Sequence, residues 1–125
     1  MEKLFIEGTE DTPEINFDTE TLQFTISGRS LPEDVTSFYK PVISWLEVYD
    51  PATSGACFNF KFDYFNTASS KIVLDILLKI EDIVNTNNSN LTVRWHYSEG
   101  DEDMFEAGEE YKDLVAIPFE IVQIN

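Results

Sequence analysis

The chain has 125 residues, the length of one domain with one hydrophobic core. Hydrophobic residues make up 42% and aromatic residues 14%, a composition that excludes a disordered acidic tail. The 24 acidic residues outnumber the 8 basic ones and give a formal net charge of -16. A field of that sign repels nucleic-acid phosphates and anionic membrane surfaces, so we expect neither as a partner. The acidic residues serve solubility, or they form a docking face for a basic protein surface.

The apolar runs and the cysteine content of the sequence limit its cellular location and redox chemistry. The N-terminal segment has no long apolar stretch of the kind that signal peptides carry, and no run approaches the roughly 18 apolar residues of a membrane span. We therefore expect a cytoplasmic protein. Cys57 is the only cysteine, which excludes an intrachain disulfide and a cysteine-based metal site. Its place in a strand-like run predicts a buried, small apolar residue rather than a reactive thiol.

The N-terminal part of the chain predicts β-structure. Residues 8–15 are polar and contain Pro13, which favours an extended segment or a sheet edge. Apolar and polar residues alternate over 22–26, as in a strand with one buried face. Gly28 and Arg29 then predict a turn.

The next segment changes to helical periodicity. Apolar residues over 32–49 recur three or four positions apart, which predicts a helix that ends at residues 50–51. Pro32 fits the first turn, and Pro41 predicts a kink or a break between two shorter helices. The small residues over 52–55 predict a loop.

The second half of the chain alternates strands and helices. The predicted elements are a strand over 58–64, a helix over 69–84, a polar loop over 85–90, a strand over 91–97, an acidic helix over 101–115 and a strand over 119–124. Strands that alternate with helices require crossover connections and helices packed on a sheet. The fold class is therefore α/β, with a single domain over 1–125 in which about three helices flank a mixed β-sheet.

Residues suited to catalysis are scarce. His96 is the only histidine, and its alternation with two aromatic neighbours predicts a surface or structural side chain, with a general base as the alternative. The nucleophile-elbow, zincin and phosphate-loop motifs are absent. Asp101 and Asp103 suggest a calcium loop, but the required glycine and distal glutamate are missing. We expect no catalytic residue, metal or cofactor, although an acidic chain always leaves paired carboxylates as an alternative.

One junction between a strand and a helix combines several hydroxyl groups. Residues 63–71 end a predicted strand and begin a helix, with hydroxyls at Thr67, Ser69 and Ser70. One reading is that one of these side chains is the helix N-cap. The other reading is a phosphorylation site, because free N–H groups and the helix dipole stabilise an added phosphate there. A phosphothreonine adds roughly -1.5 to -2 charges at neutral pH and changes a partner surface without refolding the domain.

The same residues carry a resemblance to a known family. The chain resembles the SiaC family of bacterial regulatory phosphoproteins over nearly its whole length, through short stretches in a fixed order. These stretches are GTEDTPEI (8–15), PE (32–33), ISWLE (43–47), YFNTAS (64–69), DIL (75–77), RWHY (94–97), EAGEEY (106–111) and PF (118–119). The resemblance implies a fold like that of anti-sigma-factor antagonists (STAS-like), in agreement with the predicted element order.

The resemblance also implies a function as a protein switch. In the family, a partner Ser/Thr kinase phosphorylates the threonine of an Asn-Thr step, and a PP2C-type phosphatase removes the phosphate. The unphosphorylated form binds and activates a diguanylate cyclase, which promotes aggregation or biofilm growth. The matching threonine is Thr67 here.

The expected partner surface surrounds this threonine. Its residues are Tyr64, Asn66, Ala68, Ser69, Ser70 and Lys71. The family pattern has serine where this chain has Ala68, so either that hydroxyl is not required or kinase recognition differs. The main alternative is a STAS-like interaction scaffold that does not use the phosphosite, and an enzyme is the third possibility.

Overall fold

The computed structural model describes residues 3–51, 55–87 and 89–124, so most of the loop expected over 52–55 lies outside the described residues. The strands are β1 (Leu4–Ile6), β2 (Glu14–Asp18), β3 (Gln23–Ser30), β4 (Ala56–Phe65), β5 (Leu91–Ser98) and β6 (Phe119–Ile124). The helices are α1 (Val35–Val48), α2 (Thr67–Asn87) and α3 (Glu102–Leu114). None of the helices in these ranges is long and apolar enough to cross a membrane.

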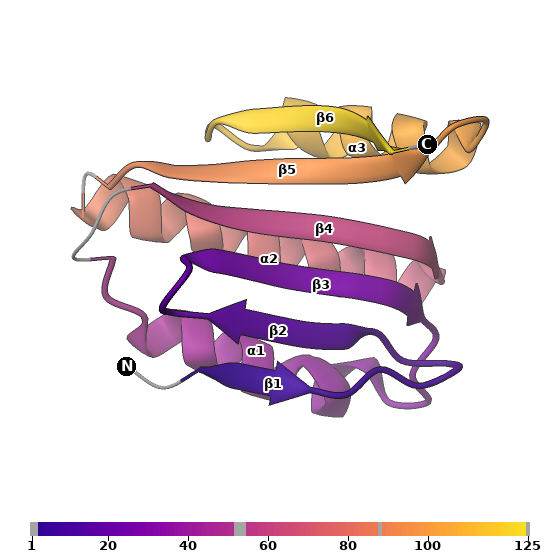
Figure 1. Cartoon of the computed structure of the whole chain (residues 1–125), viewed down its shortest axis with the longest axis horizontal. Helices are drawn as coiled ribbons and strands as arrows, with labels where there is room; N and C mark the ends of the chain where they lie inside the picture. Colours follow the sequence, from indigo (N-terminus) through magenta and orange to yellow (C-terminus); the bar gives the residue numbers. More distant parts are fainter. Residues whose placement is uncertain (1–2, 52–54, 88, 125) are drawn as a thin grey trace.

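All six strands form one mixed sheet in the order β1-β2-β3-β4-β5-β6. The β1, β2 and β3 strands are antiparallel, whereas β3, β4, β5 and β6 are parallel to their neighbours. Each parallel connection contains one helix, and Figure 1 shows α1 and α2 behind the strands. The expected α/β fold with a mixed sheet and three helices is confirmed for the described residues.

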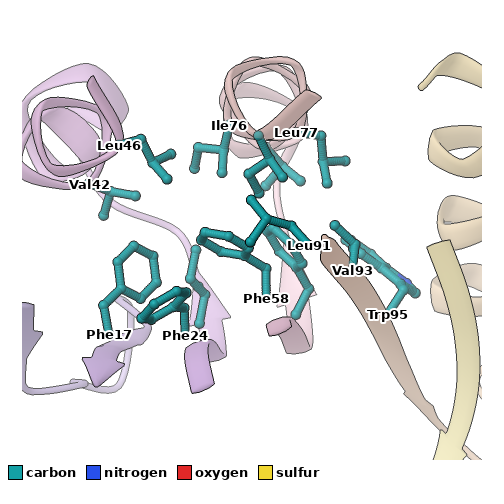
Figure 2. Close-up of a cluster of buried hydrophobic side chains, with 14 of the residues drawn as sticks. Phe17, Phe24, Val42, Leu46, Phe58, Ile76, Leu77, Leu91, Val93 and Trp95 are labelled. Atoms are coloured by element: carbon teal, nitrogen blue, oxygen red, sulfur yellow. The ribbon is translucent and has the colours of Figure 1, made fainter. Parts of the chain in front are cut away.

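The helices cover the face of the sheet that carries the aromatic core. Phe17, Phe24 and Phe58 come from three neighbouring strands and are fully or almost fully buried. The Trp45 ring of α1 lies edge-on to Phe17, with ring centroids 4.9 Å apart. Figure 2 shows the helix residues Val42, Leu46, Ile76 and Leu77 on the helix side of these rings. Aromatic residues fill the layer because each ring buries a large apolar area.

Helix α3 approaches the sheet closely. The indole Nε1 of the fully buried Trp95 donates a hydrogen bond to the backbone carbonyl of Met104, with 3.0 Å between the atoms. The glycine at 108 faces the same ring, and a Cβ atom there would lie 2.5 Å from Cδ1 of Trp95. Gly108 therefore allows the helix to pack directly onto the indole.

The sequence-based expectations at the start of the chain were wrong in two places. Residues 8–13 connect β1 to β2 and form no strand, and residues 14–15 begin β2, which lies between β1 and β3 rather than at the sheet edge. Gly28 and Arg29 lie within β3 and do not form a turn. The strand pairing shifts register between them, and Gly28 has a φ of 110°. The strand therefore bends at the glycine and continues to pair with β4.

The boundaries of α1 and α2 also differ from the expectation. The side chain of Asp34 caps α1, so Pro32 precedes the helix. Of the two outcomes expected at Pro41, a kink or a break, the break does not occur, because α1 continues through Pro41 as one helix. Pro41 is exposed and has no backbone N–H, so the helix lacks one internal hydrogen bond at this position. Helix α2 begins at Thr67 and extends to Asn87, whereas we expected it over 69–84. The acidic helix and the closing strand lie where the sequence predicts them.

Candidate functional site

Asn66 is the residue that caps α2. Its side-chain Oδ1 accepts a hydrogen bond from the backbone N–H of Ser69 at 2.8 Å. Its backbone carbonyl accepts from the N–H of Ser70 at 3.0 Å. The expectation that Thr67, Ser69 or Ser70 caps the helix was therefore wrong, because the amide of Asn66 takes that role. Thr67 becomes the first residue of the helix.

Ser69 belongs to a buried network of hydroxyl groups beneath the helix terminus. Its Oγ donates to the backbone carbonyl of Ser30 at 3.0 Å and lies 2.8 Å from the Ser30 hydroxyl. The Ser30 hydroxyl in turn lies 2.6 Å from the phenol oxygen of Tyr39 in α1. Because the Ser69 proton is used on the carbonyl, the proton order is Tyr39 to Ser30 to Ser69. Burial raises the pKa of Tyr39 to about 12, which keeps its phenol protonated as the first donor.

Three further hydrogen bonds fix the start of α2. The Ser70 hydroxyl donates to the carbonyl of Thr67 at 2.6 Å. The phenol of Tyr111, from α3, donates to the carbonyl of Ser70 at 2.8 Å. The N–H of Asn66 also donates to the carbonyl of Ser30 at 3.2 Å. The start of α2 is thus tied to β3 and α3, and it forms a rigid platform.

The side chains on the solvent side of this platform are Thr67, Ala68 and Lys71, all exposed. Within the described residues, no hydrogen bond engages the Thr67 hydroxyl. Tyr64 is 50% exposed and lies beneath the Arg29 guanidinium, whose central carbon is 5.7 Å from the ring centroid. This contact is a cation–π interaction across the β3–β4 pair.

The expected partner surface is therefore divided by the fold. Tyr64, Thr67, Ala68 and Lys71 are exposed, and Asn66 and Ser70 are half-buried. Ser69 is fully buried, so its side chain holds the helix terminus in place and is not available for contact. Helix α2 starts where the parallel strand β4 ends. In open α/β sheets, binding sites commonly form at the carboxyl ends of the strands.

A second polar cluster lies on the sheet face opposite the helices. Asn59 Oδ1 accepts from the Cys57 thiol at 3.5 Å, and the Nε2 of His96 lies 3.3 Å from the same oxygen. Burial raises the pKa of Cys57, although Arg94 opposes the effect. Both groups are directed at one amide oxygen rather than at each other, and the thiol is held protonated, which is the opposite of an activated nucleophile. Among the described residues, no group of histidine, cysteine and carboxylate side chains has metal-binding geometry.

The protonation of His96 predicts a pH dependence of stability. Burial, with Lys61 and Arg94 adding repulsion, lowers the pKa of His96 below 6.5 in the folded state. The unfolded chain therefore takes up this proton at a higher pH, and the folded state loses stability as the pH falls from 6.5 through the folded pKa. Urea midpoints measured between about pH 7.5 and about pH 5 should decline less for His96→Gln than for the wild type. Equal declines would contradict this prediction.

Comparison with known proteins places the chain in a family. The model of the SiaC family, described as SiaC family regulatory phosphoprotein, matches residues 6–124. The chain belongs to the SiaC family. A protein of Pseudomonas aeruginosa strain UCBPP-PA14 is 30% identical to this SiaC-family chain over 122 residues, which cover 97% of the chain and 96% of that protein.

Solved structures of SiaC from the same species confirm the fold. The crystal structure of diguanylate cyclase SiaD in complex with its activator SiaC contains a chain with a TM-score of 0.87 at 30% identity. That match covers 97% of this chain and 99% of the other. The structure of apo-SiaC gives a TM-score of 0.85 at 29% identity and covers 98% and 99% of the two chains.

The residues that the sequence did not reveal are those that support the platform. Ser30, Tyr39 and Tyr111 come from β3, α1 and α3, far from Thr67 along the chain. The only sequence signal was the presence of polar side chains at positions that otherwise suit the core. Such positions indicate a hydrogen-bond network, because a buried hydroxyl needs a partner.

Proposed function

We propose that this SiaC-family chain is a phosphorylation-controlled protein switch. In its unphosphorylated form it binds and regulates a diguanylate cyclase, and a Ser/Thr kinase and a PP2C-type phosphatase set its state at Thr67. The observation that carries the proposal is the match to the regulatory phosphoprotein family over 6–124, together with the complex that the similar SiaC forms with SiaD. The chain then acts in the cytoplasm, where kinases have ATP, and has no catalytic role of its own.

The geometry supports Thr67 as the phosphoacceptor. Its side chain is exposed at the first position of α2, where a kinase can reach it. Ser69 is buried in its hydroxyl network, and the Ser70 hydroxyl is bound to the Thr67 carbonyl. Of the three hydroxyls, Thr67 alone combines exposure with freedom from these bonds.

The platform also explains how a phosphate is accommodated. The first N–H groups of a helix and its dipole stabilise a negative charge. Lys71 lies one turn further along the same side of α2, at the i+4 spacing that favours an ion pair. Phosphorylation therefore changes the surface charge while the hydrogen bonds under α2 stay in place.

Mapping the phosphate tests the proposal. After treatment with the cognate kinase, mass spectrometry should find one phosphate, on Thr67. Thr67→Ala should remove it, whereas the matched variant Ser70→Ala should leave it. Modification chiefly at Ser70, or continued modification of Thr67→Ala, would contradict the assignment.

A further inference from the structure

A groove lies between the two long helices on the described part of the chain. We call it the α1–α2 groove, with a volume of about 540 Å³. Its walls include Lys40, Ile43, Ile72, Asp75, Leu78 and Asp82. Leu78 is 41% exposed on the side of α2 away from the core, whereas its neighbours Ile76 and Leu77 point toward the sheet (Figure 2). An apolar floor with charged rims is typical of an interaction surface.

The side of α2 that lines the groove also carries the proposed phosphosite. Positions 67, 71, 75, 78 and 82 recur at four- and three-residue intervals and therefore lie on one side of α2. All five side chains are exposed. Thr67 is the first residue of this stripe, and Asp75, Leu78 and Asp82 are the residues of the stripe that line the groove. Thr67 lies about 12 Å along the helix from Asp75. A molecule that extended beyond the groove along this side of α2 would reach Thr67.

The groove geometry favours a helix as the occupant. The backbone groups of α1 and α2 are already bonded within each helix, so an extended strand would find no backbone partners in the groove. A helix satisfies its own backbone and can place an apolar stripe against Ile43, Ile72 and Leu78.

The charges on the rims define the occupant further. Lys79 is paired with Glu47 at 3.6 Å, so it neutralises a carboxylate of its own chain. Asp75 and Asp82 form the α2 rim, two turns apart, and no ion pair involves either within the described residues. Two Lys or Arg residues seven positions apart on a partner helix would match them. The net charge of -16 favours the approach of such a basic surface.

We propose that the α1–α2 groove binds one amphipathic helix of the partner protein, with a Leu- or Ile-rich stripe and two basic residues seven positions apart facing α2. The inference rests on the proposed function, because the partner is the diguanylate cyclase that the unphosphorylated chain binds. It adds the docking site, the secondary structure of the docked segment and its charge pattern. It also explains how a modification at Thr67 affects the partner, since a helix that extends along α2 beyond the groove reaches that residue.

Matched variants of the full chain test this site. Leu78→Glu introduces a charge into the groove, and Leu114→Glu makes the same change at an exposed leucine of α3 that is 59% exposed. Titration calorimetry with the purified diguanylate cyclase from the same cells should show at least about tenfold weaker binding for Leu78→Glu. Leu114→Glu should stay within about twofold of the wild type. Both variants should still be phosphorylated on Thr67, because the kinase target is intact.

A photo-crosslinking residue at position 78 tests the occupant. The crosslinked cyclase peptide should be helical and carry the stated apolar and basic pattern. If the wild type binds the cyclase and Leu78→Glu binds it with the same affinity, the groove proposal is overturned and the proposed function stands. Crosslinks to a loop or strand would have the same consequence. Absence of any binding by the wild type would overturn both.

Discussion

Phosphorylation of Thr67 is expected to weaken cyclase binding by at least about a hundredfold, equivalent to about 3 kcal/mol. A partner pressed against the exposed start of α2 must exclude water from Thr67. Nearly two negative charges in such a contact lose hydration, which costs several kcal/mol unless a cation compensates. Lys71 is the basic residue on the same side of α2, and the phosphate would draw it away from the partner.

The domain itself should remain folded in the phosphorylated state. The capping bond of Asn66 and the network from Ser69 to Tyr39 do not involve the Thr67 hydroxyl. The far-ultraviolet circular dichroism spectrum and the urea midpoint should therefore change little on phosphorylation. Loss of binding would then reflect the contact surface and not unfolding.

Two variants separate charge from the loss of the hydroxyl. Thr67→Ala should bind the cyclase as tightly as the unphosphorylated wild type and stay bound in the presence of the kinase. Thr67→Asp should bind more weakly than the unphosphorylated wild type but more tightly than the phosphorylated form, because one carboxylate carries less charge than a phosphate. Calorimetry on all four forms is the measurement. Equal affinity for the phosphorylated and unphosphorylated wild type would exclude the switch and favour a scaffold that does not use the phosphosite.

Replacing Gly108 by alanine should destabilise the protein by about 2 kcal/mol or more, although alanine is the better helix former. Intrinsic propensity favours alanine over glycine inside a helix by about 1 kcal/mol. The added Cβ would lie 2.5 Å from the Trp95 ring, which is fully buried and bonded to Met104. Either the indole loses that bond or α3 moves away from the sheet, and both disrupt close packing.

Urea unfolding with circular dichroism measures this effect. The adjacent exposed residue supplies the control: Glu109→Ala changes the same helix without meeting the core and should stay within about 0.5 kcal/mol of the wild type. A Gly108→Ala protein as stable as the wild type would mean that α3 does not pack against the indole as closely as described.

The sequence by itself determined the element types and the fold class. Period-two alternation over 22–26 and 91–97 and helical spacing over 69–84 each reflect one buried face, and that signal is local. The same locality explains the errors. A glycine within a long strand and a glycine in a turn look alike, and only pairing with β4 placed Gly28 in β3.

At the candidate site, the sequence indicated Thr67 through its place at a strand-to-helix junction and through the family resemblance, and its role remains a proposal. The tertiary structure decided which hydroxyls reach the surface. Ser69 and Thr67 are two positions apart in one helical turn, so they point in different directions, and the sheet buries one of them. Which side is buried depends on Ser30 and Tyr39, distant residues whose hydroxyls meet Ser69 only when β3 and α1 pack around the start of α2. No local pattern contains that information, because hydrogen bonds between distant segments exist only in the folded chain.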